Sequence, residues 1–346
     1  MPATTTASVN GKLLPPRSPL MGWLAVVSVM LGIFAIVTTE ILPIGLLTSI
    51  GSSFTVSDGM AGLLMTMPGF LAAIAAPLVT VATARSDRRL MLCVFMLLLA
   101  LANFLAAAAP DYWLVLTSRI MVGITIGGFW SIGAGLAERL VPPASVGRAT
   151  RLGVLGGMLR SANTRFALLL TFLVVLAHFG TYTYVTPFLE QVTHASGGLI
   201  TAFLLLYGAA GILGNFLGGA WIARYPRSVF GLAAALIATV TLLLPALGRW
   251  ETGAVMLLIV WGIAYGAVPV ASQTWFSKAA PHAPEAASVL FTASFQATIS
   301  MGALVGGVVL DRTSPSAVML LGGCTAVLTV LAVGARLVGP DCGERS

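Results

Sequence analysis

Long apolar runs, each bounded by charged residues, proline or glycine, fill most of the chain. Each run provides the roughly 20 residues that a helix needs to cross the hydrocarbon core of a bilayer. The alternation of apolar and polar residues typical of a membrane-spanning strand is absent. The pattern therefore predicts an all-α, polytopic membrane protein with about ten spans, at 21–50, 60–83, 89–109, 112–140, 166–189, 197–223, 228–247, 252–276, 286–310 and 316–337.

Composition excludes several classes of protein. Of the 346 residues, 58% are hydrophobic and 8% are charged, and the mean hydropathy is +0.98. Soluble domains carry roughly 25% charged residues, so this chain cannot cover a water-facing surface of its size. A soluble enzyme, a nucleic-acid-binding protein and a disordered chain are therefore excluded. The three cysteines show no metal-ligand or C-x-x-C spacing, so we expect neither a metal site nor a cofactor.

The basic residues are distributed unevenly between the two sides of the predicted bundle. Fifteen of the 18 lysines and arginines lie in the termini or in loops on the side of the N-terminus. Only Arg249 and Arg312 lie in loops on the other side, and Arg119 lies within a span. Because basic loops stay in the cytoplasm, we expect a multi-pass protein of the cell membrane with both termini cytoplasmic.

An internal repeat divides the spans into two units. A shift of the chain by 139 residues superimposes Arg85 on Arg224 and Gly123 on Gly262, at equivalent places in the topology. The first unit contains four spans and the second contains six. We therefore expect a cytoplasmic tail at 1–20, an N-terminal bundle at 21–140, a cytoplasmic linker at 141–165, a C-terminal bundle at 166–337 and a cytoplasmic tail at 338–346.

Several segments resemble the major facilitator superfamily. They are TTEILPIGLLTSI (38–50), ARSDRRLML (84–92), LTSRIMVGITIGGFWSIGAGLAERLVPP (116–143), HFGTYTYVTPFLE (178–190) and WGIAYGAVPVASQTW (261–275). These segments look like the twelve-span bacterial drug:proton antiporter branch and are similar to sugar, drug and purine-nucleoside efflux permeases. The resemblance implies two helical bundles, an antiporter mechanism and a role in drug resistance. It also implies a fifth and a sixth helix in the first half, which this chain lacks together with the G-x-x-x-G-P motif of the fifth.

Two functional hypotheses follow. The first is a secondary active transporter that exports small organic molecules against an inward flow of protons by alternating access. The second is an internally deleted, non-transporting remnant of such a permease. An enzyme is not expected, because the spans contain no pair of acids and no nucleophile with its base. The expected partners are a small-molecule substrate, protons and the lipid bilayer, with no nucleic acid, and we expect a monomer.

Glu40 and Arg119 are the candidate proton-coupling or substrate-binding residues. Glu40 is the only acid well inside an apolar run, and Arg119 is the only cation there. They lie roughly 15 and 10 Å from the outer ends of their spans at 1.5 Å per residue, so we expect a direct pair. Glu40 then exchanges a proton or binds a cationic substrate, while Arg119 favours its charged form. The alternatives are a structural ion pair or a Glu40 that reaches the outer interface.

The short loop between the second and third spans contains Asp87, Arg88 and Arg89. One hypothesis is a gating latch that breaks when the inward-facing state opens. The alternative is that the arginines only set the orientation of the chain, in which case Asp87 contributes nothing.

Small residues recur along several spans at a spacing of about four. This spacing lets helix backbones approach each other, so we assign these residues to helix packing rather than to substrate binding. They are Gly123, Gly127, Gly135, Gly214, Gly218, Gly302 and Gly306.

Aromatic and amide side chains inside the spans are candidates for the lining of a cavity for amphipathic molecules. Some of them could instead anchor the helices at the membrane interface. His178 could relay protons or could be a hydrogen-bonded packing residue. The candidates are Trp130, His178, Tyr182, Tyr184, Tyr265, Gln273 and Gln296.

Overall fold

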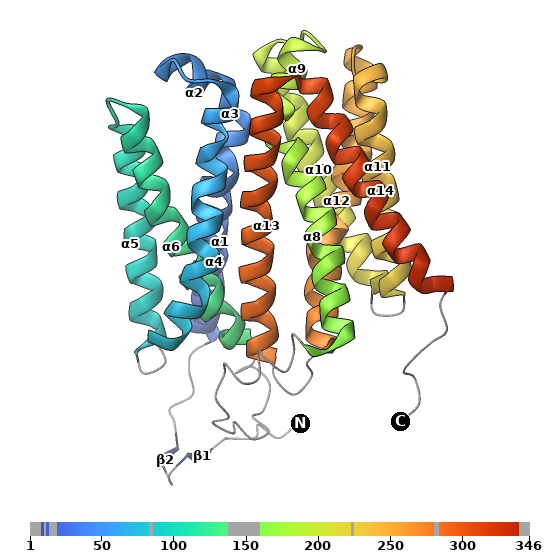
Figure 1. Cartoon of the computed structure of the whole chain (residues 1–346). Helices are drawn as coiled ribbons and strands as arrows, with labels where there is room; N and C mark the ends of the chain where they lie inside the picture. Colours follow the sequence, from blue (N-terminus) through green and yellow to red (C-terminus); the bar gives the residue numbers. More distant parts are fainter. Residues whose placement is uncertain are drawn as a thin grey trace.

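A computed structural model describes residues 8–9, 12–13, 19–82, 86–137, 160–222, 225–279 and 284–338. Long, nearly parallel helices make up almost all of these residues (Figure 1). The exception is a ladder of two short antiparallel strands, β1 (Ser8–Val9) and β2 (Lys12–Leu13). The expected all-α fold is confirmed.

Ten long helices follow one another along the described residues. Each is long and apolar enough to cross a membrane, by length and composition, so the predicted number of spans is confirmed. They are α1 (Pro19–Gly45), α4 (Leu63–Ala82), α5 (Arg88–Ala107), α6 (Tyr112–Ala137), α8 (Ala162–Tyr182), α10 (Gly197–Ile222), α11 (Pro226–Leu247), α12 (Glu251–Ala279), α13 (Pro284–Arg312) and α14 (Pro315–Val338). Three short helices are α2 (Leu47–Phe54), α3 (Asp58–Ala61) and α9 (Val185–Gln191).

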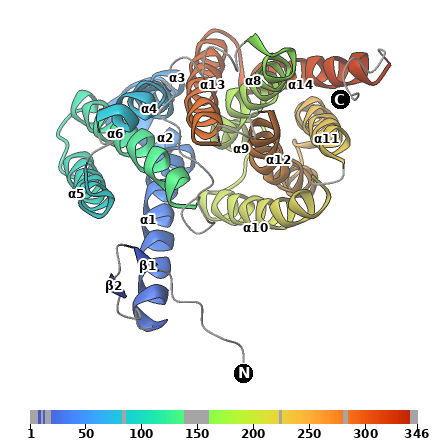
Figure 2. The same cartoon turned by 90° about the horizontal axis from the view of Figure 1, so that it is seen from below.

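The long helices form two groups, which the view from below separates clearly (Figure 2). We call α1, α4, α5 and α6 the N-terminal bundle, and α8 and α10 to α14 the C-terminal bundle. Ile36, Leu99 and Ile126 belong to the core of the first, and Phe188, Leu258 and Trp261 to the core of the second. Residues 138–159 lie outside the described part, so most of the predicted linker is not described, and α8 begins at Ala162.

The two ends of the molecule differ. Helix α1 begins and α14 ends at the lower end of Figure 1, whereas α2, α3 and α9 lie at the upper end. The chain therefore enters and leaves the bundle on the same side, as an even number of spans requires. In the text below, the lower end and the upper end have this meaning.

The main seam between the bundles runs along α4 and α13. An added Cβ at Gly62 would overlap the Tyr184 hydroxyl, and one at Gly69 would lie 2.7 Å from the backbone oxygen of Gln296. A side chain at Gly69 would push α13 away, and one at Gly62, just before α4, would displace the Tyr184 ring. At Gly69 the two bundles thus approach each other at backbone-to-backbone range.

Much of the apolar surface faces outward. Trp23, Met30 and Phe34 of α1 and Leu205 and Phe216 of α10 are each more than 60% exposed. The lower half of α1 projects beyond the other helices in Figure 2. Apolar side chains exposed over such an area match a surface in contact with lipid.

Close packing of α6 on α4 predicts different responses to the same substitution at two glycines. An added Cβ at Gly127 would lie 2.6 Å from the Ala72 oxygen, whereas at Gly219 on α10 nothing lies within 4 Å. We expect Gly127→Ala to destabilise the protein by about 1–3 kcal/mol because the helices must separate. Gly219→Ala should be neutral or stabilising by up to about 1 kcal/mol, since alanine favours a helix.

Thermal unfolding of the purified protein in detergent measures both effects. Equal melting temperatures for the two variants would contradict the close α4–α6 contact.

Candidate functional site

Glu40 and Gln296 connect the two bundles inside the membrane-spanning region. Glu40 lies in the upper half of α1, and Gln296 lies near the middle of α13. The Gln296 Nε2 donates a hydrogen bond to the Glu40 Oε1 over 3.0 Å. Gln296 is 5% exposed and Glu40 is half-buried, so the bond is partly shielded from its surroundings. Separation of the bundles at this level must break it.

Arg119 lies beside this bond but does not pair with Glu40. Its Nη1 donates to the backbone oxygen of Thr39 over 2.9 Å. No ion pair joins Arg119 to Glu40 within the described residues, so the direct pair expected from sequence is not formed. Similar depth in the membrane was not sufficient, because the guanidinium reaches the backbone one residue before Glu40 instead.

Two buried polar atoms near this contact have no hydrogen-bond partner within the described part of the chain. They are the Nε of Arg119, a donor, and the Oε1 of Gln296, an acceptor. Both side chains are more than nine-tenths buried. Buried polar atoms are costly when unpaired, so they favour the presence of water or a polar ligand. Glu40, Gln296 and Arg119 together form what we call the junction site.

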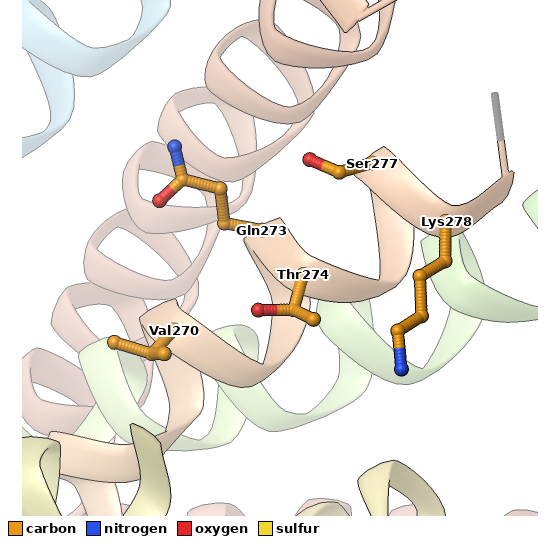
Figure 3. A pocket seen from close by; sticks show the side chains of 5 residues that line it. All are labelled: Val270, Gln273, Thr274, Ser277 and Lys278. Carbon is orange, nitrogen blue, oxygen red and sulfur yellow. The ribbon is translucent and has the colours of Figure 1, made fainter. Parts of the chain in front are cut away.

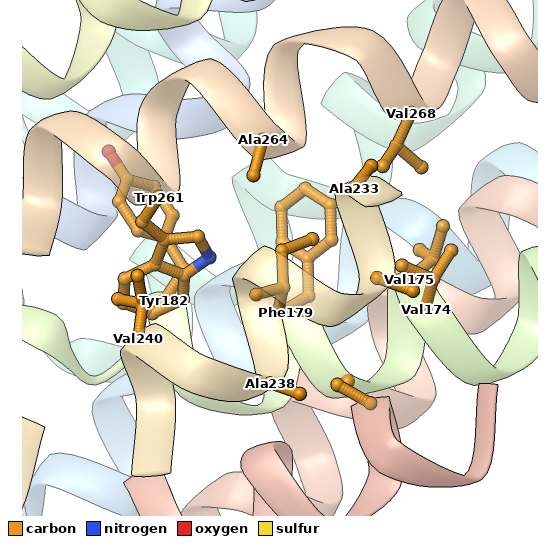
Figure 4. Close-up of a cluster of buried hydrophobic side chains, with 14 of the residues drawn as sticks. Val174, Val175, Phe179, Tyr182, Ala233, Ala238, Val240, Trp261, Ala264 and Val268 are labelled. Atoms are coloured by element: carbon orange, nitrogen blue, oxygen red, sulfur yellow. The ribbon is translucent and has the colours of Figure 1, made fainter. Parts of the chain in front are cut away.

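Three of the aromatic candidates come together in the C-terminal bundle. His178 stacks on Tyr265 with ring centroids 3.3 Å apart, and on Tyr182 at 5.1 Å. Trp261 and Tyr207 complete the cluster and were not singled out from the sequence, although both lie inside apolar runs as Tyr265 does. Tyr182 and Trp261 are seen among the surrounding apolar side chains in Figure 4.

The hydrogen bonds of His178 indicate its state. The Trp261 Nε1 donates to the Nδ1 of His178 over 3.1 Å, so this nitrogen carries no proton. The Nε2 lies 3.4 Å from the Tyr207 hydroxyl. A neutral ring 1% exposed and held on both nitrogens fits the packing hypothesis better than the proton-relay hypothesis.

The other cavity candidates lie apart from this cluster. Tyr184 is fully buried at the upper end and donates to the Ala303 oxygen, while Trp130 packs edge-on against Phe129 in the N-terminal bundle. Gln273 lines a cavity of about 470 Å³ in the lower half of α12 (Figure 3). Its other lining residues are Val270, Thr274, Ser277 and Lys278. The seven candidates therefore do not form one site.

Hydrogen bonds at the upper end also cross between the bundles. The Asp311 carboxylate of α13 accepts from the Ser57 hydroxyl over 2.8 Å and from the Gly59 N–H over 3.0 Å, at the start of α3. The Thr48 hydroxyl donates to the Glu190 Oε1 over 2.8 Å. Thr48 and Glu190 belong to the lining of a cavity of about 650 Å³. We call these contacts the upper contacts.

The predicted gating loop has a local role in the structure. The Asp87 Oδ1 accepts from the backbone N–H of Arg89 over 2.8 Å and caps the N-terminus of α5. Arg89 is exposed, and the Nη1 of Arg88 is buried without a partner among the described residues. No ion pair of Asp87 across the bundles is present in that part of the chain.

The predicted packing glycines lie at helix crossings. At Gly123 an added Cβ would lie 2.5 Å from the Pro68 oxygen, and at Gly218 it would lie 2.6 Å from the Ala267 Cβ. Both positions therefore require glycine for the observed approach of the helices.

The remaining packing glycines behave in the same way where they can be described. An added Cβ at Gly302 would lie 2.9 Å from the Gly180 nitrogen, and Gly214 and Gly306 are closer still to the backbones of α12 and α8. The surroundings of Gly135 lie outside the described residues.

A metal site finds no support in the described ranges. No three His, Cys, Asp or Glu side chains within them are grouped so that they could hold a metal ion.

Comparison with known proteins gives relatives along most of the chain. The Transcription regulatory protein OpdE of Pseudomonas aeruginosa is 28% identical over 377 aligned positions, which cover 89% of this chain and 93% of that protein. The alignment is longer than the 346 residues of this chain, so that protein has residues inside the matched region that this chain lacks.

Solved structures share the fold. The crystal structure of the human organic anion transporter MFSD10 (TETRAN) matches with a TM-score of 0.63 and 16% identity, covering 92% of this chain and all of that one. The crystal structure of a point mutant of the nucleoside transporter NupG matches with a TM-score of 0.68 and 12% identity, covering 88% of this chain and 98% of that one.

The sequence profile of one family covers nearly the whole chain, at residues 23–164 and 167–341. Two helical bundles of membrane-spanning length and the structural neighbours agree with this match. The protein is therefore a membrane transporter that belongs to the Major Facilitator Superfamily.

Proposed function

We propose that the protein exports small organic molecules from the cytoplasm in exchange for protons, by alternating access around the junction site. One observation carries the proposal: Glu40 of one bundle bonds to Gln296 of the other at 3.0 Å, inside the spans. A carboxylate at this depth costs roughly 2.5–3.5 kcal/mol on insertion scales, and such groups mark pathways for ions and substrates. The bond is also positioned to respond to movement between the bundles.

Protonation of Glu40 supplies the coupling step. An ionised carboxylate is the stronger acceptor for the Gln296 amide, and a protonated one holds it less tightly. Proton binding therefore favours separation of the bundles at the junction site. The unpaired Gln296 Oε1 is available to a substrate that presents a hydrogen-bond donor.

Alternating access requires contacts that break at each end in turn. The upper contacts, among them Asp311 with Ser57 and Gly59, hold the upper end together. The cavity beside Gln273 lies towards the lower end, which we propose to be cytoplasmic because most of the basic residues are expected on that side. Substrate would enter from this side and leave after the upper contacts open.

The structural neighbours support small organic solutes as the substrate class. One carries the name of an organic anion transporter and the other that of a nucleoside transporter. The resemblance to efflux permeases adds drugs and sugars to the compounds worth testing.

A second candidate function is a membrane protein that no longer transports. The observation in its favour is the alignment with the Pseudomonas aeruginosa protein, which is longer than this chain, as expected for the loss of two helices. That relative is named a regulatory protein, which would suit such a role. Transport by the wild-type chain in everted membrane vesicles decides between the two candidates.

Glu40→Gln tests the coupling role. We expect proton release driven by substrate to fall by about 100-fold or more, the scale of losing a proton-transfer group. The variant keeps the shape of the side chain but cannot exchange a proton. The assay uses everted vesicles with a pH-sensitive dye and, as probes, chloramphenicol, inosine and methyl galactoside.

Glu251→Gln is the matched control, because Glu251 is exposed at the start of α12. It should behave as the wild type. Unchanged proton release in Glu40→Gln would refute the coupling role, and absence of transport by the wild-type chain with every probe would favour the second candidate.

Two substitutions of Asp87 separate a helix cap from a gating latch. Asparagine also caps a helix, whereas alanine does not and should cost about 1 kcal/mol of stability. If Asp87 acts only as a cap, Asp87→Asn retains wild-type transport and melting temperature, and Asp87→Ala lowers the latter. If the charge of Asp87 instead forms a gating latch that breaks when the inward-facing state opens, Asp87→Asn alters transport, while the melting temperature of this variant equals that of the wild type.

A further inference from the structure

Pro43 leaves one backbone carbonyl of α1 without its usual partner. The helix continues through this proline to Gly45. Proline has no N–H, so it cannot donate to the carbonyl four residues earlier, which is that of Thr39. In the hydrocarbon core, where water is absent, an unsatisfied backbone group costs several kcal/mol. Another donor must therefore reach Thr39 from outside the helix.

Arg119 of α6 is that donor. Its Nη1 lies 2.9 Å from the Thr39 oxygen, and its side chain is 6% exposed. A charged donor makes a stronger bond than the neutral N–H that proline removed. The side chain of Thr39 is held as well, because its Oγ1 accepts from the Asn103 Nδ2 of α5 over 3.0 Å. Both contacts fix the residue that precedes Glu40.

Apolar packing also holds this part of α1, because Ile36, one turn before Glu40, is fully buried in the core of the N-terminal bundle. Such packing supplies no donor for the Thr39 carbonyl, so it cannot replace the contact with Arg119. Glu40 itself reaches across to Gln296 of the other bundle. Its position relative to Gln296 therefore also depends on how firmly the Thr39 backbone and side chain are tied to α6 and α5.

We infer that Arg119 is a positioning residue: it replaces the backbone donor that Pro43 removes from α1 and thereby sets the turn that presents Glu40 to Gln296. This inference rests on the proposed function for the role of Glu40, but its structural part does not. It assigns to Arg119 a task that does not require contact with substrate or with the Glu40 carboxylate. The task exists only because residue 43 is proline.

A double-mutant cycle tests the inference. Arg119→Met is made in the wild-type chain and in a Pro43→Ala background, in which the new alanine supplies its N–H to the Thr39 carbonyl. In the wild-type chain we expect Arg119→Met to lower kcat for the best transported probe by about 10- to 100-fold, as for other misplaced reacting groups. In the Pro43→Ala background the loss should shrink to within about threefold, because residues of one hydrogen-bond network are not additive.

The control background is Pro77→Ala in α4, which restores a backbone N–H far along the chain from Thr39. It should not reduce the effect of Arg119→Met. A shift of the pH profile of transport should accompany Arg119→Met in the wild-type chain and vanish in the Pro43→Ala background. If Arg119→Met acted only by disturbing the packing of the helices, the pH profile of transport would not shift.

Melting temperatures of the same variants keep the test independent of transport. The fall caused by Arg119→Met should be larger in the wild-type background than in the Pro43→Ala background. Equal falls in both backgrounds, with equal losses of transport, would overturn the inference even if Glu40→Gln abolishes coupling. If Glu40→Gln leaves coupling intact, the proposed function fails, while the difference in melting temperature still supports Arg119 as the donor to Thr39.

Discussion

The absence of water from the bilayer core is the constraint on which the rest of this structure depends. Every polar group there must find its partner within the protein or in a ligand. Ten long helices meet most of this requirement through their own backbones. Two of the buried polar atoms that have no partner among the described residues, the Arg119 Nε and the Gln296 Oε1, lie where α6 and α13 approach Thr39 and Glu40 of α1. The hydrogen bonds from Arg119 to the Thr39 carbonyl and from Gln296 to Glu40 thus both supply partners for polar groups that water cannot reach.

Glycine and hydrogen bonding have complementary roles at the boundary between the bundles. Gly69 lets α4 approach the backbone of α13, and Gly62, just before α4, leaves room for the Tyr184 ring, so these contacts depend on shape rather than on the direction of a bond. The hydrogen bonds of Gln296 and Asp311 depend on the orientation of donor and acceptor, and each of them can break without the other. A boundary of this kind resists separation along its length yet retains discrete polar contacts that a proton or a solute can weaken.

The spans were predictable because their signal is local, whereas the contacts of the site were not. Apolar runs and glycine spacing can each be recognised within a single helix. The first predicted the ten long helices, and the second predicted glycines at close helix crossings. Depth in the membrane placed Glu40 and Arg119 at similar levels but could not give the rotation of each helix about its axis. That rotation decides that Arg119 meets the Thr39 carbonyl and that Glu40 meets Gln296. Pro43 was visible in the sequence, and its missing N–H was the one signal that could have indicated a donor from another helix.

The contact between Arg119 and Thr39 has a consequence for how the sequence can evolve. Proline at position 43 and a long donor at position 119 lie far apart in the chain, yet each makes the other tolerable. Once the proline has been replaced, the Thr39 carbonyl has a backbone donor again, and position 119 can accept other residues. If the arginine is replaced first, the Thr39 carbonyl stays unpaired and the protein is less stable until the proline is replaced as well. Substitutions at the two positions should therefore be inherited in a preferred order, with the imino acid exchanged before the cation.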